Sequence, residues 1–277
     1  MKQPAPSTSP AAELHGWGPT TTCRPPTGPD PHAYRIATSA NGHWAEGAVL
    51  VSNVQQPFVR LESVSKSYRS GSSKLEVLDG LDLDLPQGET TSLVGRSGTG
   101  KSTLLSLIAG LMSPDTGHIH IGGQQLDQLD DDSRASLRAE RIGFVLQSDN
   151  LIPFLTAVEN VELAMGFAAG RHSTTRAREL LTDLGLAHRM DHLPRQLSGG
   201  ESQRVAVAVA LANEPDLLLA DEVVGQLDSS TAGEVMELIF TASRERNLTV
   251  LYVTHDEQLA RQAHRSLRLT DRKVVPA

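Results

Sequence analysis

The sequence contains a single cysteine, Cys23, among 277 residues, so no disulfide can form within the chain. No apolar stretch approaches the ~18–20 residues that a transmembrane helix needs. The start of the chain has no apolar core of the kind found in secretory signals. Basic residues are also too few for a nucleic-acid coat, because 25 Lys and Arg stand against 33 Asp and Glu, a net charge of −8. These absences predict an acidic, soluble, cytoplasmic protein without a nucleic-acid partner.

The first 56 residues differ in composition from the rest. They hold eight of the 15 prolines, interleaved with Ser, Thr and Gly, and their acidic and basic residues balance. Such a segment buries too little apolar area to offset the entropy of ordering it, so we expect a disordered extension over residues 1–56. Trp17 and Trp44 are either docking residues or, more ordinarily, unattached linker aromatics. The folded domain is expected over residues 57–277.

Strand-like and helix-like runs alternate from residue 58 onwards. Residues 58–64 and 81–85 alternate apolar and polar side chains, as half-buried strands do. Further strands are predicted at 91–94, 141–146, 217–220 and 249–253, and helices at 101–111, 229–246 and 256–263. This alternation predicts an α/β fold with a mostly parallel sheet. Residues 150–214 show helical patterns only, which predicts an all-helical subdomain inserted between sheet strands.

A phosphate-binding pattern follows the strand predicted at 91–94. Residues 95–102 read GRSGTGKS, a complete GxxxxGK[ST] match between an apolar strand and an apolar helix. The glycines allow backbone N–H groups to surround phosphate oxygens at a helix N-terminus. Lys101 is expected to bridge the β- and γ-phosphates of ATP, and the Ser102 hydroxyl to hold Mg²⁺. The predicted nucleotide-binding residues here are Gly95, Arg96, Ser97, Gly98, Thr99, Gly100, Lys101, Ser102 and Thr103.

Two adjacent carboxylates follow the apolar strand predicted at 217–220. Asp221 is expected to hold Mg²⁺ through its water shell, and Glu222 to polarise the water that attacks the γ-phosphate. Two acids at a strand end can also begin a solvated loop. The phosphate-binding pattern upstream favours the catalytic interpretation, with ATP and Mg²⁺ as the cofactors.

Residues 197–204 read LSGGESQR and resemble the signature motif of ABC ATPases. The resemblance covers residues 57–277. It implies an α/β P-loop NTPase fold of the ABC type, with a mostly parallel sheet core, an antiparallel β part and an inserted all-helical subdomain. It also implies a head-to-tail dimer around two ATP, either a homodimer or a heterodimer with a related ATPase. The residues implied to close on the γ-phosphate held by the other subunit's phosphate loop are Ser198, Gly199, Gly200 and Glu201.

Four further residues match the pattern of that family in order. Gln147 resembles the Q-loop glutamine, implied to sense Mg²⁺ and to contact the membrane partner, and His255 resembles the switch histidine that touches the γ-phosphate. Asp228 resembles the D-loop acid that communicates across the dimer, and Tyr68 the A-loop aromatic that stacks on adenine. Each residue alone would be an ordinary surface or core group, and their shared order supports the assignment. The catalytic residues implied are Glu222, His255, Lys101 and Gln147.

The segment from Phe144 to Val161 resembles the lipoprotein-release, macrolide-export and cell-division branch of the family, through FVLQ, NLIP and TAVENV. That resemblance implies a separately encoded transmembrane permease as partner. It also implies an ATPase subunit bound peripherally at the cytoplasmic face of the cell membrane.

The sequence departs from the family after the expected catalytic glutamate. Val223 and Val224 stand where Pro and Thr are usual, Val209 replaces a usual arginine, and Glu214 replaces a common basic residue. Proline would fix φ, whereas β-branched residues favour an extended backbone. None of these changes removes a group that acts on phosphate or water, so they favour a slow or regulated ATPase over an inactive one.

Two other functions compete with a transporter ATPase. One is a regulatory nucleotide-binding subunit with little turnover, which the two valines suggest and an ATPase assay would distinguish. The other is a soluble ABC ATPase that acts on DNA or ribosomes. Proteins of that class usually carry coiled-coil arms, zinc-binding cysteines or two motor domains, and this sequence has a single cysteine and a single phosphate-binding pattern.

Overall fold

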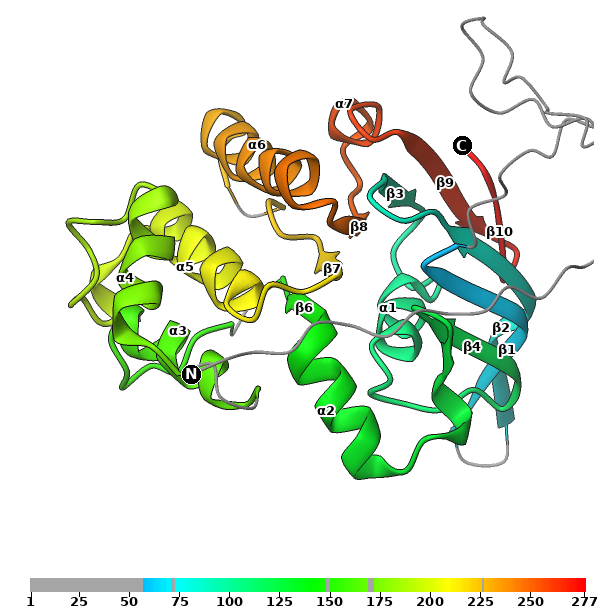
Figure 1. Cartoon of the computed structure of the whole chain (residues 1–277). Helices are drawn as coiled ribbons and strands as arrows, with labels where there is room; N and C mark the ends of the chain where they lie inside the picture. The colour runs from blue at the N-terminus through cyan, green and yellow to red at the C-terminus, as the bar shows by residue number, and fades with distance from the viewer. Residues whose placement is uncertain (1–56, 71–72, 148–149, 169–171, 226) are drawn as a thin grey trace, which may run out of the picture. The chain divides into compact units, whose positions relative to one another are not determined.

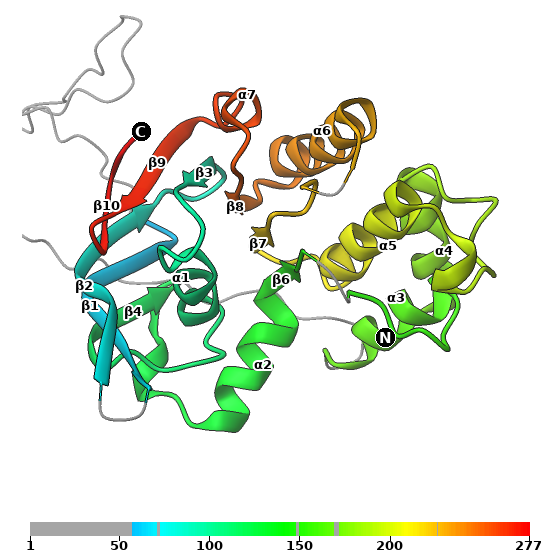
Figure 2. The same ribbon diagram turned by 180° about the vertical axis from the view of Figure 1, so that it is seen from behind.

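The computed structural model describes residues 57–70, 73–147, 150–168, 172–225 and 227–277. The extension predicted over residues 1–56 lies outside the described residues, so both it and the domain boundary at residue 57 stay predictions. The described strands form two sheets, shown from opposite sides in Figures 1 and 2.

The first sheet is antiparallel, with the strand order β2-β1-β4-β5. Its strands are β1 (Val59–Ser70), β2 (Ser73–Leu85), β4 (Thr116–Ile121) and β5 (Gln124–Gln125). The first two are longer than the runs predicted at 58–64 and 81–85, and the last two were not predicted. Val59 and Leu61 of β1 are buried whereas Glu62 is exposed, so one face of this sheet covers the core.

The second sheet has six strands in the order β10-β9-β3-β8-β7-β6. Its strands are β3 (Thr90–Val94), β6 (Ile142–Val145), β7 (Leu217–Asp221), β8 (Thr249–Val253), β9 (Arg265–Thr270) and β10 (Lys273–Pro276). Neighbouring strands are parallel except β9 and β10, which are antiparallel. The prediction of a mostly parallel sheet core with an antiparallel β part is therefore confirmed.

Strand β7 separates two hydrophobic cores. Leu217 and Leu219 face the core that contains α1 (Lys101–Ile108) and the buried side of the antiparallel sheet. Leu218 and Ala220 face the other core, which is formed mainly by helices. A strand buried on both faces has no polar side to show, which explains its unbroken apolar run.

The described residues between 150 and 214 contain helices and no strand. These helices are α3 (Ala157–Gly166), α4 (Thr174–Asp183), the short 3-10 helix η2 (Pro194–Gln196) and α5 (Gly199–Leu211). Both ribbon views show α3, α4 and α5 together beside β6 and β7, the last two strands at one end of the six-stranded sheet. The helical insertion expected for the fold class is thus present.

The remaining helices are η1 (Leu126–Gln128), α2 (Asp131–Arg141), α6 (Ser229–Arg246) and α7 (Glu257–Ala260). Of these, α2 was not predicted, and α7 is shorter than the helix predicted at 256–263. Helix α6 has the predicted bounds. None of the helices in the described parts of the chain combines the length and the apolar content needed to cross a bilayer.

Candidate functional site

The strand order brings the predicted catalytic segments to one edge of the six-stranded sheet. Strands β3, β8, β7 and β6 are adjacent and parallel, so their carboxyl ends lie on the same side. The phosphate loop (residues 95–102) follows β3, His255 follows β8 and Gln147 follows β6. Asp221 is the last residue of β7, and Glu222 comes directly after it. In open α/β sheets, ligands bind in the crevice outside this edge.

The phosphate loop folds around the side chain of its own lysine. Lys101 is 6% exposed, and its Nζ donates to the carbonyl oxygens of Gly95 (2.9 Å) and Arg96 (3.0 Å). Gly100, which caps α1, has φ +104°, and a Cβ there would collide with the side chain of Val77. The loop therefore places an ammonium group beside the N–H groups that begin α1, which is an arrangement suited to phosphate.

Glu222 takes a left-handed backbone conformation directly after β7, with φ +49°. Such a conformation costs a non-glycine residue about 1–2 kcal/mol. Two backbone bonds hold the turn: the Glu222 N–H donates to Val253 O (3.2 Å), and the Gly225 N–H donates to Glu222 O (3.0 Å). The Nδ1 atom of His255 lies 3.9 Å from Glu222 Oε2. The structure thus brings these two predicted catalytic residues together.

The two valines that replace Pro and Thr are packed rather than solvated. Val223 and Val224 are 5% and 8% exposed and belong to the helical core. The Leu227 N–H donates to Val224 O (3.1 Å), so the chain turns again immediately after them. Their apolar side chains therefore anchor the turn that carries Glu222.

The three residues expected at the metal lie on separate segments. Ser102 is the second residue of α1 and is exposed, Asp221 ends β7 and is half-buried, and Gln147 follows β6 and is exposed. No hydrogen bond or ion pair in the described part of the chain joins them. Asn150, which sequence reasoning did not single out as functional, holds the segment before Gln147: its side chain accepts from Leu146 N–H (2.6 Å) and donates to Leu146 O (2.7 Å).

Ser198 caps the N-terminus of α5 in a reciprocal capping box. The Glu201 N–H donates to Ser198 Oγ (3.2 Å), and the Ser198 N–H donates to Glu201 Oε2 (2.8 Å). A Cβ at Gly200 would collide with Thr231 of α6, so only glycine fits where the two helices meet. Among the described residues, no hydrogen bond or ion pair joins residues 198–201 to the phosphate loop. Both ribbon views show α1 and α5 apart, with β6 and β7 between them, so the two predicted phosphate-binding segments of one chain are separated.

Asp228 lies beside this helix start. Its carboxylate caps α6, accepting from Ser230 N–H (3.1 Å), Thr231 N–H (3.1 Å) and Thr231 Oγ1 (2.7 Å). The hydrogen bond from the Thr231 hydroxyl is the main reason that the pKa of Asp228 is lowered. Leu227, the preceding residue, lies in contact distance of the position that a Cβ on Gly199 would take. The D-loop and signature segments are therefore neighbours, whereas Gln226 lies outside the described residues.

Arg189 holds the carboxylate of Glu201 and was missed by sequence reasoning. Its Nε donates to Glu201 Oε1 at 2.8 Å. The hydrogen bond from Ser198 N–H and then the one from Arg189 lower the pKa of Glu201 to about 2. No local pattern could reveal this contact, because the two residues meet only when the turn after α4 folds against the start of α5.

Tyr68 lies next to the helix that follows the phosphate loop. Its hydroxyl oxygen is 3.3 Å from Thr103 Oγ1 and donates to Met112 Sδ (3.4 Å). The side chain remains 40% exposed. The structure therefore places an accessible aromatic ring beside Thr103, the third residue of α1.

Comparisons with known proteins match these features. Residues 78–225 match the model of the family described as ABC transporter. The chain is 46% identical over 215 residues to the uncharacterized ABC transporter ATP-binding protein YbbA of Escherichia coli (strain K12), which covers 77% of this chain and 94% of YbbA. It is 47% identical over 214 residues to the lipoprotein-releasing system ATP-binding protein LolD of Geobacter metallireducens, which covers 76% of this chain and 95% of LolD.

A solved structure has the same fold. It is the dimeric structure of a post-hydrolysis state of the ATP-binding cassette MJ0796 bound to ADP and Pi. It matches with a TM-score of 0.73 and 41% identity, covering 78% of this chain and 96% of that chain. The predicted family and branch are confirmed by these relatives. The chain therefore belongs to the ABC transporter family and is an ATP-binding, ATP-hydrolysing member of it.

Proposed function

We propose that the chain pairs head to tail with a second ATPase subunit and hydrolyses ATP in sites that both subunits build. Each ATP would lie between the phosphate loop of one subunit and residues 198–201 of the other. The observation that carries this proposal is the separation of these two segments within one chain, although both begin helices whose first N–H groups suit an anion. The similar cassette MJ0796 is described as dimeric in its solved structures.

The roles proposed for the catalytic residues follow from their positions. Lys101 would turn its ammonium from the loop carbonyls to the β- and γ-phosphates, and so neutralise charge that develops during hydrolysis. Glu222, whose side chain is 24% exposed, would orient the attacking water and draw its proton. His255, 3.9 Å from that carboxylate, would contact the γ-phosphate and keep it beside the water. Tyr68 would stack on the adenine ring.

The residues proposed at the metal supply the right type of ligand. A serine hydroxyl (Ser102), a carboxylate (Asp221) and an amide oxygen (Gln147) are hard oxygen donors, which Mg²⁺ prefers. The described residues contain no group of three or more His, Cys, Asp or Glu side chains that could hold a metal. Mg²⁺ at this place would therefore share ligands with the nucleotide, as is usual for this ion. When bound, it would neutralise charge on the phosphates.

We further propose that a separately encoded permease docks beside α3, which follows the Gln147 segment. Four of the large hydrophobic side chains exposed in the described structure lie between residues 146 and 167: Leu146, Phe154, Leu163 and Phe167. Phe154 and Phe167 are 76% and 70% exposed, so this one stretch of the chain concentrates exposed apolar side chains of the kind that interaction surfaces use.

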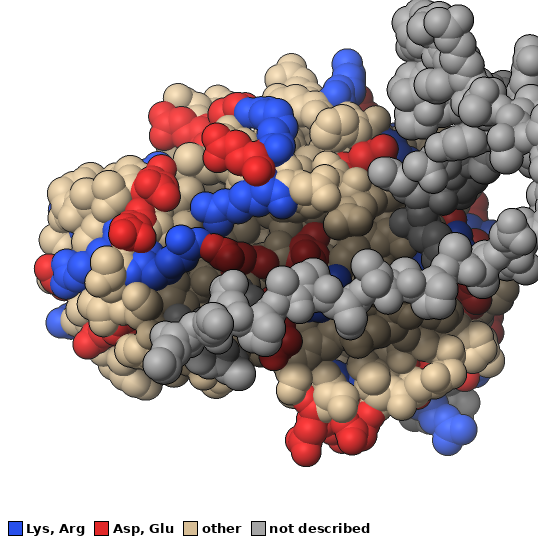
Figure 3. Space-filling model, in the orientation of Figure 1, with Lys and Arg blue, Asp and Glu red and all other residues tan. Residues whose placement is uncertain are grey.

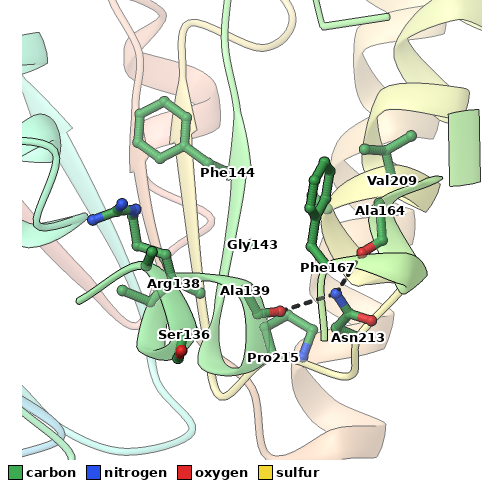
Figure 4. A pocket seen from close by; sticks show the side chains of 13 residues that line it. Ser136, Arg138, Ala139, Gly143, Phe144, Ala164, Phe167, Val209, Asn213 and Pro215 are labelled. Atoms are coloured by element: carbon green, nitrogen blue, oxygen red, sulfur yellow. Dashed lines mark hydrogen bonds between the residues drawn. The ribbon is translucent and has the colours of Figure 1, made fainter. Parts of the chain in front are cut away.

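A pocket of about 430 Å³ adjoins this surface. Figure 4 shows side chains of α2 and β6 on one side of it and those of α3 and α5 on the other. Asn213 bridges the two sides, since its Nδ2 donates to Ala139 O (2.9 Å) and to Ala164 O (2.8 Å). An apolar segment of the permease seated here would touch both the sheet domain and the helical insertion. Through these two contacts, the permease segment would follow a movement of the helical insertion against the sheet domain. This chain would be bound peripherally at the cytoplasmic face of the membrane.

One observation favours a second candidate, a regulatory subunit with slow turnover. The packed side chains of Val223 and Val224 hold the turn that carries Glu222, and in the family this turn usually contains Pro and Thr. A nucleic-acid partner has no such support. On the face shown in Figure 3, acidic side chains lie beside the basic ones, and the chain carries a net charge of −8, whereas such partners need a basic surface.

The test of the proposed pairing uses Glu222→Gln, which keeps the shape of the side chain but removes its basic charge. This variant should bind Mg-ATP without hydrolysing it and should accumulate as a dimer in light scattering, whereas the wild type returns to monomer after turnover. Glu237→Gln, a change of the same kind on the exposed face of α6, is the matched control and should behave as wild type. Adding Ser198→Arg should abolish the dimer and leave ATP binding to the monomer largely intact.

The outcome that contradicts the pairing is a Glu222→Gln variant that binds Mg-ATP yet stays monomeric, both alone and with its permease. If it dimerises only with the permease, the permease holds the pair together. If Val223→Pro with Val224→Thr restores the dimer without the permease, the packed valines displace the turn, which supports the slow-turnover candidate.

A further inference from the structure

The start of α5 carries a negative charge beside the anion site that it is proposed to form. Glu201 is the third residue of α5, and with a pKa of about 2 its carboxylate is ionised at neutral pH. The N–H groups of Gly199 and Gly200 precede the first helical hydrogen bond, from Ser202 N–H to Ser198 O, so the helix itself leaves them unpaired. A γ-phosphate bound to these groups would lie close to a carboxylate of the same sign, which opposes binding.

Arg189 compensates this charge. The two oxygens of the Glu201 carboxylate have different partners: Oε2 accepts from the Ser198 N–H (2.8 Å) and Oε1 accepts from Arg189 Nε (2.8 Å). The Glu201 side chain is 13% exposed and that of Arg189 35%, so solvent screens the pair only partly. His188 lies farther away, with its Nε2 at 3.8 Å from the same Oε1.

Backbone hydrogen bonds attach the segment around Arg189 to α3. The Arg189 N–H donates to Leu186 O (2.9 Å), which closes a turn. The carbonyl oxygens of Met190 and His192 accept from the N–H groups of Val158 and Ala157 at the start of α3, each at 2.9 Å. The guanidinium therefore approaches Glu201 from a segment whose backbone is bonded to α3.

We propose that Arg189 is a positioning residue for the ATP-dependent dimer, because its guanidinium neutralises Glu201 and keeps this carboxylate turned into the capping box. The start of α5 can then accept the γ-phosphate of an ATP held by the partner subunit. This inference rests on the proposed head-to-tail pairing. It has a specific consequence: the arginine is needed only while residue 201 is acidic.

A double-mutant cycle in the Glu222→Gln background tests this consequence. The dissociation constant of the Mg-ATP dimer is measured by light scattering for four proteins, with and without Arg189→Ala and with and without Glu201→Gln. Arg189→Ala should weaken the dimer by about tenfold, the size expected for loss of a hydrogen bond to a charged group. In the Glu201→Gln background the same substitution should change the dissociation constant by less than about twofold. ATP affinity of the monomer should not change with Arg189→Ala.

The readouts separate a charge effect from a structural one. If Arg189 only stabilises the turn after α4, Arg189→Ala weakens the dimer equally with Glu201 and with Glu201→Gln, and the proposal is overturned. It is also overturned if Arg189→Ala leaves the dimer unchanged. Arg189→Lys keeps the charge, so the dissociation constant of its dimer should lie between that of the Glu222→Gln parent and that of Arg189→Ala. Failure of the pairing itself has a different signature, since the Glu222→Gln parent would then form no ATP-dependent dimer and both proposals would fall.

Discussion

The ammonium nitrogen of Lys101 lies 2.9 Å from the carbonyl oxygen of Gly95, six residues earlier in the chain. The lysine of the phosphate loop therefore stabilises the loop through hydrogen bonds to its backbone, and it is also the residue proposed to bind the phosphates of ATP. This dual use means that the lysine is buried, at 6% exposure, although it belongs to a binding loop. A substitution there should affect chemistry strongly and stability only moderately.

Lys101→Ala should lower the ATPase rate by at least about a hundredfold, since loss of one preorganised charge donor has effects of this size. The free energy of unfolding should fall by about 2 kcal/mol, because the Gly95 and Arg96 carbonyl oxygens lose a charged donor. The ATPase rate is measured by phosphate release, and the free energy of unfolding is measured by circular dichroism. Lys74→Ala removes an exposed lysine of β2 and serves as the control. Wild-type turnover in Lys101→Ala would contradict the proposed role.

Glu201 should make stability depend on pH in the acidic range. Its pKa is about 2 in the folded protein, against an ordinary value of 4.5, chiefly because of the hydrogen bond from Ser198 N–H. A depressed pKa stabilises the folded state fully above about pH 4.5, and this contribution is lost as pH falls towards 2. The Tm of Glu201→Gln should therefore lie below that of wild type at pH 7, and the gap should narrow between pH 5 and pH 3. A gap that stays constant over this range would show that the charge of Glu201 does not stabilise the fold.

The sequence predicted best those elements whose signal is local. Strand β8 and helix α6 have the predicted bounds, because an unbroken apolar run and a long helical pattern need no partner to be recognised. Strand β4 was missed because only two of its six residues TGHIHI, Ile119 and Ile121, are buried, and the other four are polar residues or glycine. Helix α2 was missed because Leu137 is its only buried residue, so it lacks an apolar stripe.

The candidate site shows the same division between local and long-range information. The GRSGTGKS pattern specifies a loop, a helix start and a lysine within eight residues, and the structure forms all three. By contrast, the contact of Arg189 with Glu201 and that of Tyr68 with Thr103 depend on how separate segments pack. The burial of Val223 and Val224 likewise depends on the helical core, which the sequence could not specify at that turn.

Removing residues 1–56 should leave the ATPase rate and the Tm nearly unchanged, because their composition offers little apolar area to bury. The control is a truncation of residues 1–58, which also removes Pro57 and Phe58. Phe58 is 5% exposed, its N–H donates to Leu85 O (2.8 Å), and the Arg141 guanidinium lies 5.2 Å from its ring. Loss of this side chain should cost about 3 kcal/mol, or several degrees in Tm. A large loss of Tm in the shorter truncation would show that the extension contributes to folding.

Tyr68→Ala should raise the KM for ATP by about tenfold, the effect of losing one base–aromatic stack, and should change kcat little. The ring contributes through its face, whereas its hydroxyl contacts Thr103 and Met112. Tyr68→Phe keeps the face, so its KM should stay within about twofold of wild type. Stacking does not read the base edge, so KM for GTP should rise by a similar factor in Tyr68→Ala. If Tyr68→Phe is as defective as Tyr68→Ala, the hydroxyl contacts matter more than stacking. In that case the tyrosine acts by holding the start of α1, and Thr103→Val should reproduce the defect.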